Sequence, residues 1–306
     1  MFIHFVRIQS LIFRVHSGDS MFQSFFDKPY FMLQYFAVWA ALLGVAIFML
    51  LPSYSGGWLM PLLVIGLTLT MRFDTMLLAI VPAVLLSPEP LETTVFLISL
   101  LPITVSIGIA AAALVHNTSH SILKPRWLNT CIGELASLLV RTNFFGWKMV
   151  HYYHHKHADD VENDPHCPKG RAFWPYANTM QKATVDYLDA KHLELHHLPK
   201  PIYILTMVLG ALIFVGTPLF WLLVFGPTLF AAVWVPVFIS GWWLFFVINY
   251  YNHPFDEKGV STPVNLNTKV WHKLTNVVSF GTLYHKNHHE DASFFNPSKK
   301  PASESN

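Results

Sequence analysis

Long apolar runs dominate the hydrophobic pattern of this chain. Four of them reach the ~20 residues that an α-helix needs to cross a bilayer. These runs lie at residues 31–51, 93–115, 202–225 and 228–250. Only Gly226 and Pro227 separate the last two, which predicts a helical hairpin. The pattern therefore predicts an all-α integral membrane protein with four long transmembrane helices.

A fifth apolar stretch, residues 57–87, is interrupted by Arg72 and Asp74. Its two pieces are short for crossing a bilayer. They predict either a short re-entrant hairpin or two thin spans, and the second alternative gives the chain six spans. Both alternatives return the chain to the same side of the membrane before Pro88, so the orientation of the remaining spans does not depend on the choice.

The charged residues give the orientation. They make up 12% of the chain, against about a quarter in soluble domains. The net charge of +2 is too small to indicate a nucleic-acid partner. Lysines and arginines gather before residue 31, between 117 and 200 and after 251. Placing these groups in the cytosol satisfies the positive-inside rule and makes both termini cytosolic.

We expect a single domain over residues 1–306. Its parts are a cytosolic or interfacial N-terminus (1–30), spans (31–115), a cytosolic segment (116–200), a helical hairpin (201–250) and a cytosolic segment with a disordered tail (251–306). Cys131 and Cys167 do not form a CxxC pair. We therefore expect free thiols, and a separate protein as the donor in any electron transfer.

The chain has 17 histidines, and their spacing carries the chemical signal. On a helix, residues three and four apart lie on one face, so such a cluster can direct its ring nitrogens at one point. Three clusters have this spacing, and a further histidine stands four residues after Asn249. The candidate ligands are His116 and His120, His151, His154 and His155, His285, His288 and His289, and the outlying His253.

Imidazole suits iron, zinc, copper or nickel, and eight converging rings exceed what one tetrahedral ion can use. The number therefore indicates two metal ions. All nine candidates fall in the segments predicted to be cytosolic, so the topology allows the clusters to converge on one side of the membrane. The cytosolic cap of the protein is thus the expected site of a two-metal centre.

Other residues near these clusters have two interpretations. His192, His196 and His197 also have box-like spacing, but they end an amphipathic segment that fits a structural role or a substrate entrance. They could still replace one of the clusters. His157, His166 and His272 are unpaired in spacing. Five acids either accept the outer N–H of ligating imidazoles or form solvated turns. These acids are Asp159, Asp160, Asp164, Glu290 and Asp291.

The boxes HxxxH, HxxHH and HxxHH, with the Asn-x-x-x-His element at Asn249 and His253, resemble the membrane fatty acid desaturase and hydroxylase superfamily over residues 93–290. The resemblance implies two Fe²⁺ ions held by the nine histidines, with Asn249 touching a metal-bound water. It also implies O₂ as co-substrate, a lipid or fatty acyl substrate, and an electron donor of the ferredoxin, rubredoxin or cytochrome b5 type. The extra hairpin at 57–87 is more similar to the alkane hydroxylase branch.

The Asn249 and His253 element makes fatty acyl desaturation the first expectation. Hydroxylation of an alkane or fatty acid, and oxidative decarboxylation to a terminal alkene, use the same oxidising chemistry and stay open. A divalent-metal transporter is a rival from another class, and it needs polar or ionisable groups inside its spans. Residues 201–250 contain no charged residue and no histidine, which disfavours transport.

Overall fold

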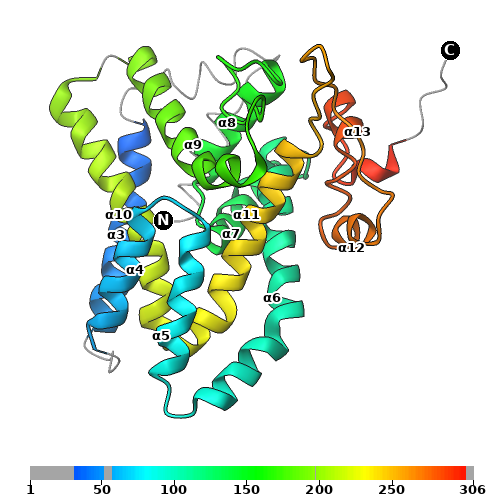
Figure 1. Cartoon of the computed structure of the whole chain (residues 1–306). Helices are drawn as coiled ribbons and strands as arrows, with labels where there is room; N and C mark the ends of the chain where they lie inside the picture. Colours follow the sequence, from blue (N-terminus) through cyan, green and yellow to red (C-terminus); the bar gives the residue numbers. More distant parts are fainter. Residues whose placement is uncertain (1–30, 52–56, 197, 301–306) are drawn as a thin grey trace. The chain divides into compact units, whose positions relative to one another are not determined.

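The structure is a computed structural model that describes residues 31–51, 57–196 and 198–300. Within these ranges it is helical, with two isolated β-bridges and no strand. The predictions for residues 1–30 and 301–306 and for His197 fall outside the described residues, as do the side chains of His192 and His196. The described chain forms two compact units, which are treated separately (Figure 1).

The first unit contains the described residues up to Thr104 together with Val185–Pro236. In it α10 packs against α3 and α4. Gly210 and Gly216 of α10 face Phe36 and Leu43 of α3, so small residues bring the two helices close. The elements that begin here are α3 (Phe31–Leu50), α4 (Leu59–Leu69), η2 (Asp74–Ala79), α5 (Ile80–Leu85), α6 (Pro90–Ser119), α10 (Lys200–Leu229) and the π-helical turn η3 (Phe230–Trp234).

Three helical stretches of the described chain are long and apolar enough to cross a membrane, and they are Leu33–Leu50, Pro90–Ser119 and Lys200–Tyr250. Gly226 breaks the third, a 51-residue stretch, because its backbone takes a glycine conformation with φ 76° and ψ 169°. The four predicted long spans are therefore confirmed as helical segments, and the helix breaks at Gly226, where the sequence predicts a turn between the last two.

The stretch at 57–87 forms short helices, as the interrupted pattern predicts. α4 is followed by a turn in which Arg72 and Asp74 form an ion pair of 2.8 Å. The chain then continues through η2 and α5. Whether these helices re-enter or span the bilayer stays a prediction.

The second unit contains Val105–Thr184 and the described residues from Val237 onward. Here α6 and α11 meet backbone to backbone: a side chain at Gly108 would come within 2.2 Å of the Val237 carbonyl oxygen. The contact joins the two helices that carry candidate ligands at or beyond their C-terminal ends. The elements of this unit are the end of α6, α7 (Trp127–Val140), α8 (Phe144–Lys156), the start of α9 (Phe173–His196), α11 (Val235–Tyr250), α12 (Val270–Val278), α13 (His285–Glu290) and η4 (Pro297–Lys299).

Helix α8 is built to be buried. The side chain of Asn143 accepts a hydrogen bond from the Gly146 amide at 2.7 Å and caps the helix start. Phe144 and Trp147 are almost fully buried, and Gly133 of α7 leaves the space that the Phe144 ring fills. A capped and largely buried helix thus carries the second histidine box. Both cysteines are free, as expected.

Candidate metal centre

The histidine boxes lie at helix ends within the second unit. His116 belongs to the last turn of α6, and His120 follows that helix directly. The second box lies in the last turns of α8, and the third box forms most of α13. His253 comes three residues after the end of α11. Helix α6 continues beyond the predicted span 93–115, and this C-terminal extension carries the start of the first box.

Eight of the nine predicted ligands come together in two groups. Within each group one ring nitrogen of every member lies within 4.8 Å of the others. The first histidine group is His116, His120, His151 and His288, and the second histidine group is His154, His253, His285 and His289. The ninth residue, His155, borders the first group, because its Nε2 lies 3.2 Å from Nε2 of His151 and 3.0 Å from Nε2 of His288.

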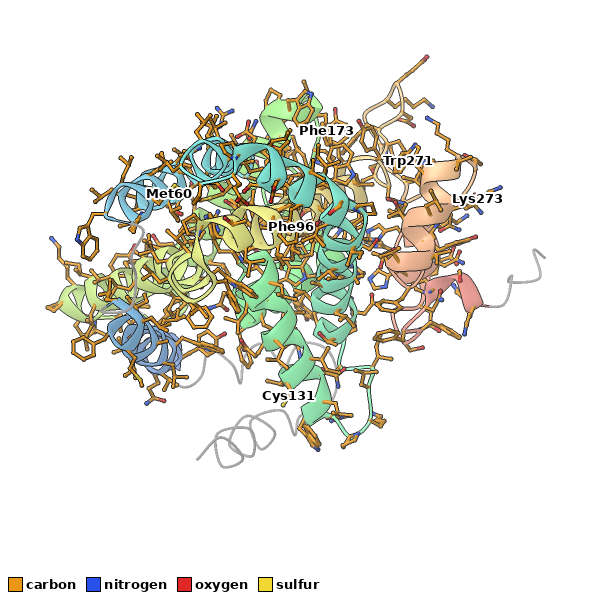
Figure 2. The ribbon with its side chains drawn as sticks, turned by 90° about the horizontal axis from the view of Figure 1, so that it is seen from below. Met60, Phe96, Cys131, Phe173, Trp271 and Lys273 are labelled. Carbon is orange, nitrogen blue, oxygen red and sulfur yellow. The ribbon has the colours of Figure 1, made fainter. Side chains whose placement is uncertain are left out.

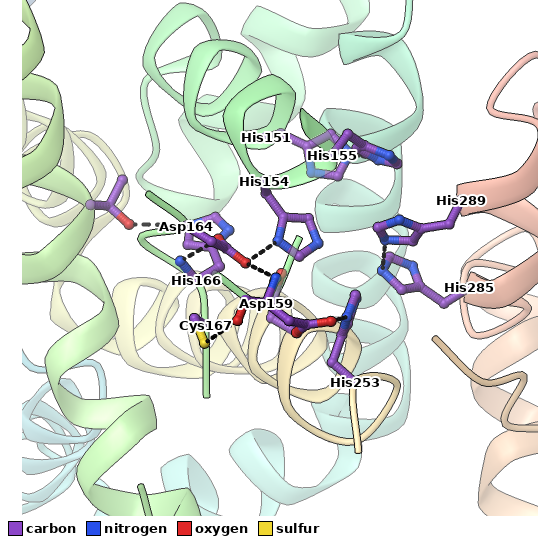
Figure 3. A network of polar contacts seen from close by, with 12 residues as sticks. His151, His154, His155, Asp159, Asp164, His166, Cys167, His253, His285 and His289 are labelled. Carbon is purple, nitrogen blue, oxygen red and sulfur yellow. Dashed lines mark hydrogen bonds and ion pairs between the residues drawn. The ribbon is translucent and has the colours of Figure 1, made fainter. Parts of the chain in front are cut away.

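The ring nitrogens point inward and crowd one another. Nε2 of His120 lies 2.9 Å from Nε2 of His151, and Nε2 of His285 lies 3.1 Å from Nε2 of His289 (Figure 3). Two neutral imidazoles can share only one proton in such a contact. Nε2 of His116, His154 and His253 is buried without a hydrogen-bond partner in the described part of the chain. Unpaired buried nitrogens are costly, and metal ions would satisfy them.

Burial keeps most of these imidazoles neutral. Desolvation, followed by the repulsion of neighbouring rings, holds the pKa of His120, His155 and His288 well below the usual value. The same causes lower the pKa of His285 and His289. A neutral imidazole is the form that binds a metal. The donor set therefore fits metal ions at both groups.

Two carboxylates orient the second group (Figure 3). Nδ1 of His154 lies 2.8 Å from Oδ2 of Asp164, and Nδ1 of His253 lies 3.0 Å from Oδ2 of Asp159. Burial lowers the pKa of His154, but the attraction and hydrogen bond of Asp164 outweigh it and raise that pKa overall. Each carboxylate holds its imidazole with the proton on Nδ1, which leaves Nε2 free to bind a metal.

Asp164 is itself firmly held. Its oxygens also accept hydrogen bonds from the backbone amides of Asp159, at 3.0 Å, and His166, at 2.8 Å. The three other predicted acids have partners outside the two groups. Asp160 accepts from the amide of Glu162, Glu290 pairs with Lys300, and Asp291 accepts from the amide of Ser293.

The first group has no such carboxylate among the described residues. Nδ1 of His116 lies 3.0 Å from the side-chain oxygen of Asn117. The amide nitrogen of Asn117 donates in turn to the Phe295 carbonyl at 2.8 Å. A neutral amide thus takes the place that a carboxylate has in the second group.

His166 is a residue of the centre that the spacing argument missed. Its side chain is fully buried, and its ring centroid lies 5.9 Å from that of His154. Burial lowers its pKa to about 3. In the sequence, its position two residues after Asp164 is the feature that could have pointed to this location. His272, by contrast, is used in helix capping: its Nδ1 accepts from the Lys269 amide.

Asn249 and His157 have defined surroundings. The Asn249 amide nitrogen donates to the Phe245 carbonyl at 2.7 Å. Its side-chain oxygen is buried and contacts the His166 ring, a contact that raises the pKa of His166 against the larger effect of burial. The His157 ring stacks on Tyr153, with ring centroids 6.3 Å apart.

The fold and the centre define an all-α membrane protein with a histidine-rich site that can bind two metal ions. Residues 92–293 match the family model described as fatty acid desaturase. Because this match covers more than half of the chain, the protein belongs to the fatty acid desaturase family. No solved structure matches it.

Shorter stretches are similar to curated relatives. The chain is 36% identical over 50 residues to the sn-1 acyl-lipid omega-3 desaturase (ferredoxin) of Nostoc sp. (strain 36), which is 16% of this chain and 14% of the relative. It is 37% identical over 60 residues to the Delta-9 acyl-lipid desaturase 2 of Arabidopsis thaliana, 19% of each chain. It is 30% identical over 71 residues to the sn-1 oleoyl-lipid 12-desaturase of Anabaena variabilis, 22% of this chain and 20% of the relative. These matches span a fifth or less of each relative.

Proposed function

We propose that the protein is an O₂-dependent, non-haem di-iron oxidoreductase that introduces a double bond into a fatty acyl chain of a lipid. One observation carries the proposal: four separate segments bring eight imidazoles into two groups, with His155 beside the first group, and their inward nitrogens are unpaired or mutually crowded. Two iron ions, when bound, supply the reduction of O₂ and the oxidising power that side chains lack for an unactivated C–H bond.

Each group would hold one Fe²⁺ ion. In this assignment His155 completes the first group, with His116, His120, His151 and His288. The second ion would be held by His154, His253, His285 and His289. The buried side-chain oxygen of Asn249, four residues before His253, suits a hydrogen bond to a water of the second group.

The names of the relatives support the substrate class. All three are acyl-lipid or oleoyl-lipid desaturases, and one name includes ferredoxin. In the proposed reaction two hydrogens leave adjacent carbons. O₂ takes them up with two further electrons and two protons and ends as two water molecules. The two electrons would come from a separate donor of the ferredoxin, rubredoxin or cytochrome b5 type.

The proposed orientation places both termini and all nine histidines in the cytosol. It rests on the distribution of lysines and arginines along the sequence. A soluble donor could then reach the centre from the cytosol, while the acyl chain comes from the bilayer.

The test is expression of the full chain, with a ferredoxin and its reductase, in a host with a simple saturated lipid profile. Lipids and volatile products are then analysed with the iron content of the purified protein. We expect new unsaturated acyl chains in the lipids and two iron ions per chain.

The control is His154→Ala, which removes one proposed ligand. It should lose the product and part of the iron while remaining in the membrane fraction. An unchanged product profile in this variant, or wild-type protein purified without iron, would contradict the proposal. Hydroxylated lipids or terminal alkenes in place of unsaturated lipids would redirect it to the alternative reactions.

A further inference from the structure

Helix α12 has a fixed orientation in the metal-binding unit. It starts where the Lys269 amide donates to Nδ1 of His272, whose side chain is buried. Asn276 ties its far end down by donating to the Leu266 carbonyl at 2.9 Å and accepting from the Leu283 amide at 3.0 Å. The face that carries His272 and Asn276 is therefore bonded to the rest of the unit.

The other face of α12 is apolar and exposed. Val270 is 73% exposed, Leu274 64% and Val277 79%, and these residues recur at the four- and three-residue spacing of one helix face. Trp271 beside them is also exposed. A surface helix of a soluble domain normally turns such a stripe toward the core, so this stripe requires another apolar partner.

The charge around this stripe is positive. Between Glu257 and Glu290 the sequence contains four lysines and no acidic residue. Lys269 and Lys273 of this set stand at the exposed side of α12. Figure 2 shows Lys273 near Trp271 on this helix. The surface thus combines aliphatic side chains with long basic ones, whose stems can lie along an apolar phase while the ammonium groups stay in water.

The position of α12 points to the partner. In Figures 1 and 2 it lies beside α6, and Figure 1 shows it below α13, level with the turns of α6 that precede the first box. Those turns belong to a helix that is long and apolar enough to span a membrane. An apolar face at this level would meet lipid.

We infer that α12 is an interfacial helix that buries Val270, Leu274 and Val277 in the bilayer leaflet where α6 ends, with Lys269 and Lys273 at anionic head groups. This composition is that of an interfacial amphipathic helix. Protein–protein interfaces, by contrast, are depleted in lysine. An acidic electron-donor protein is therefore the less suitable occupant. The third box begins seven residues after α12, so the helix holds that box at the bilayer surface.

The test uses the iron-loaded full chain in lipid nanodiscs, with one fluorescent bimane label. Leu274→Cys and Val270→Cys report on α12, and Val260→Cys, which is 58% exposed outside the helix, is the matched control. All are made in a Cys131→Ser background, and the labelled background protein serves as the blank. Nitroxide-bearing lipids quench a probe in the bilayer, and iodide quenches a probe in water.

We expect lipid nitroxides to quench the two α12 probes several-fold more than the Val260 probe, and iodide to show the reverse order. Anionic lipid should strengthen the lipid quenching at α12 over purely zwitterionic lipid. Probes at α12 that iodide quenches as strongly as the control would overturn the inference. So would probes that become protected only when an acidic ferredoxin is added. Iron content equal to that of the wild type shows that each variant is folded.

Discussion

The two histidine groups differ in what supports their rings. In the second group, carboxylates of Asp164 and Asp159 contact Nδ1 of His154 and His253. In the first group, Nδ1 of His116 contacts a neutral partner, the side-chain amide oxygen of Asn117. A carboxylate raises the basicity of its imidazole and fixes its tautomer more firmly than a neutral amide does. Both groups consist of histidines, but the support of their imidazoles therefore differs.

Among the rings of the second group, only His154 has a raised pKa, because Asp164 outweighs the effect of burial. Burial lowers the pKa of His253, His285 and His289, as it does for His120 and His155 beside the first group. From the two carboxylate contacts we expect the second group to bind its ion more tightly, and the comparison can be tested one partner at a time.

The largest effect should come from removing a ligand of either group. His288 and His289 are neighbours in sequence but belong to different groups. His288→Ala and His289→Ala should each abolish desaturation, since the proposed reaction uses both ions, and each should lower the iron content from two ions to one. Metal analysis and lipid analysis of the pair check this. If either variant keeps full activity, or both lose all iron, the division into two groups is wrong.

Asp164→Asn should have the next largest effect. Loss of an outer carboxylate typically lowers metal affinity or activity by about 10–100-fold. Asp164 also anchors two backbone amides, so the change should fall at the upper end of that range. Titration of iron into the metal-free protein measures the affinity. Equal iron affinity in the variant and the wild type would show that the carboxylate has no role in metal binding.

Asp159→Asn should have a smaller effect than Asp164→Asn. The Asp159 carboxylate is 10% exposed, whereas that of Asp164 is fully buried, so water can replace part of its contact with His253. We expect a loss near the lower end of the ~10–100-fold range. The matched control is Asp160→Asn, whose carboxylate lies in a solvated turn and should leave iron affinity unchanged. The comparison fails if the control weakens iron binding as much as Asp159→Asn.

Asn117→Ala should have the smallest effect. It removes a neutral partner of His116 and the hydrogen bond to the Phe295 carbonyl, and a neutral hydrogen bond contributes about 1 kcal/mol. We expect a several-fold loss of affinity at the first group and none at the second. A loss as large as that of Asp164→Asn would remove the difference between the groups.

Helical spacing predicted each box, because residues three and four apart share a face wherever a helix forms. The same spacing could not divide the boxes between two groups. His154 and His155 are adjacent in sequence and lie beside different groups. That division depends on how the ends of α6 and α11 meet α8 and α13, which is long-range packing.

Spacing also failed for single residues. His166 has no paired histidine, so the pattern excluded it, although the loop bound to Asp164 buries it beside His154. No feature of the sequence favours any of the five acids as a partner of a ligating histidine. The folded loop brings Asp159 and Asp164, but not Asp160, into contact with a histidine of the second group. The spans were predictable because about 20 apolar residues in a row already meet the length that a bilayer requires.

Mössbauer spectroscopy of the protein loaded with isotope-enriched iron tests the central claim most directly. The two unequal histidine groups predict two iron ions per chain and two distinct subspectra of equal area. They also predict that His289→Ala retains only one of these subspectra. A single subspectrum in the wild type, or a centre that holds one iron ion or zinc, would contradict the account.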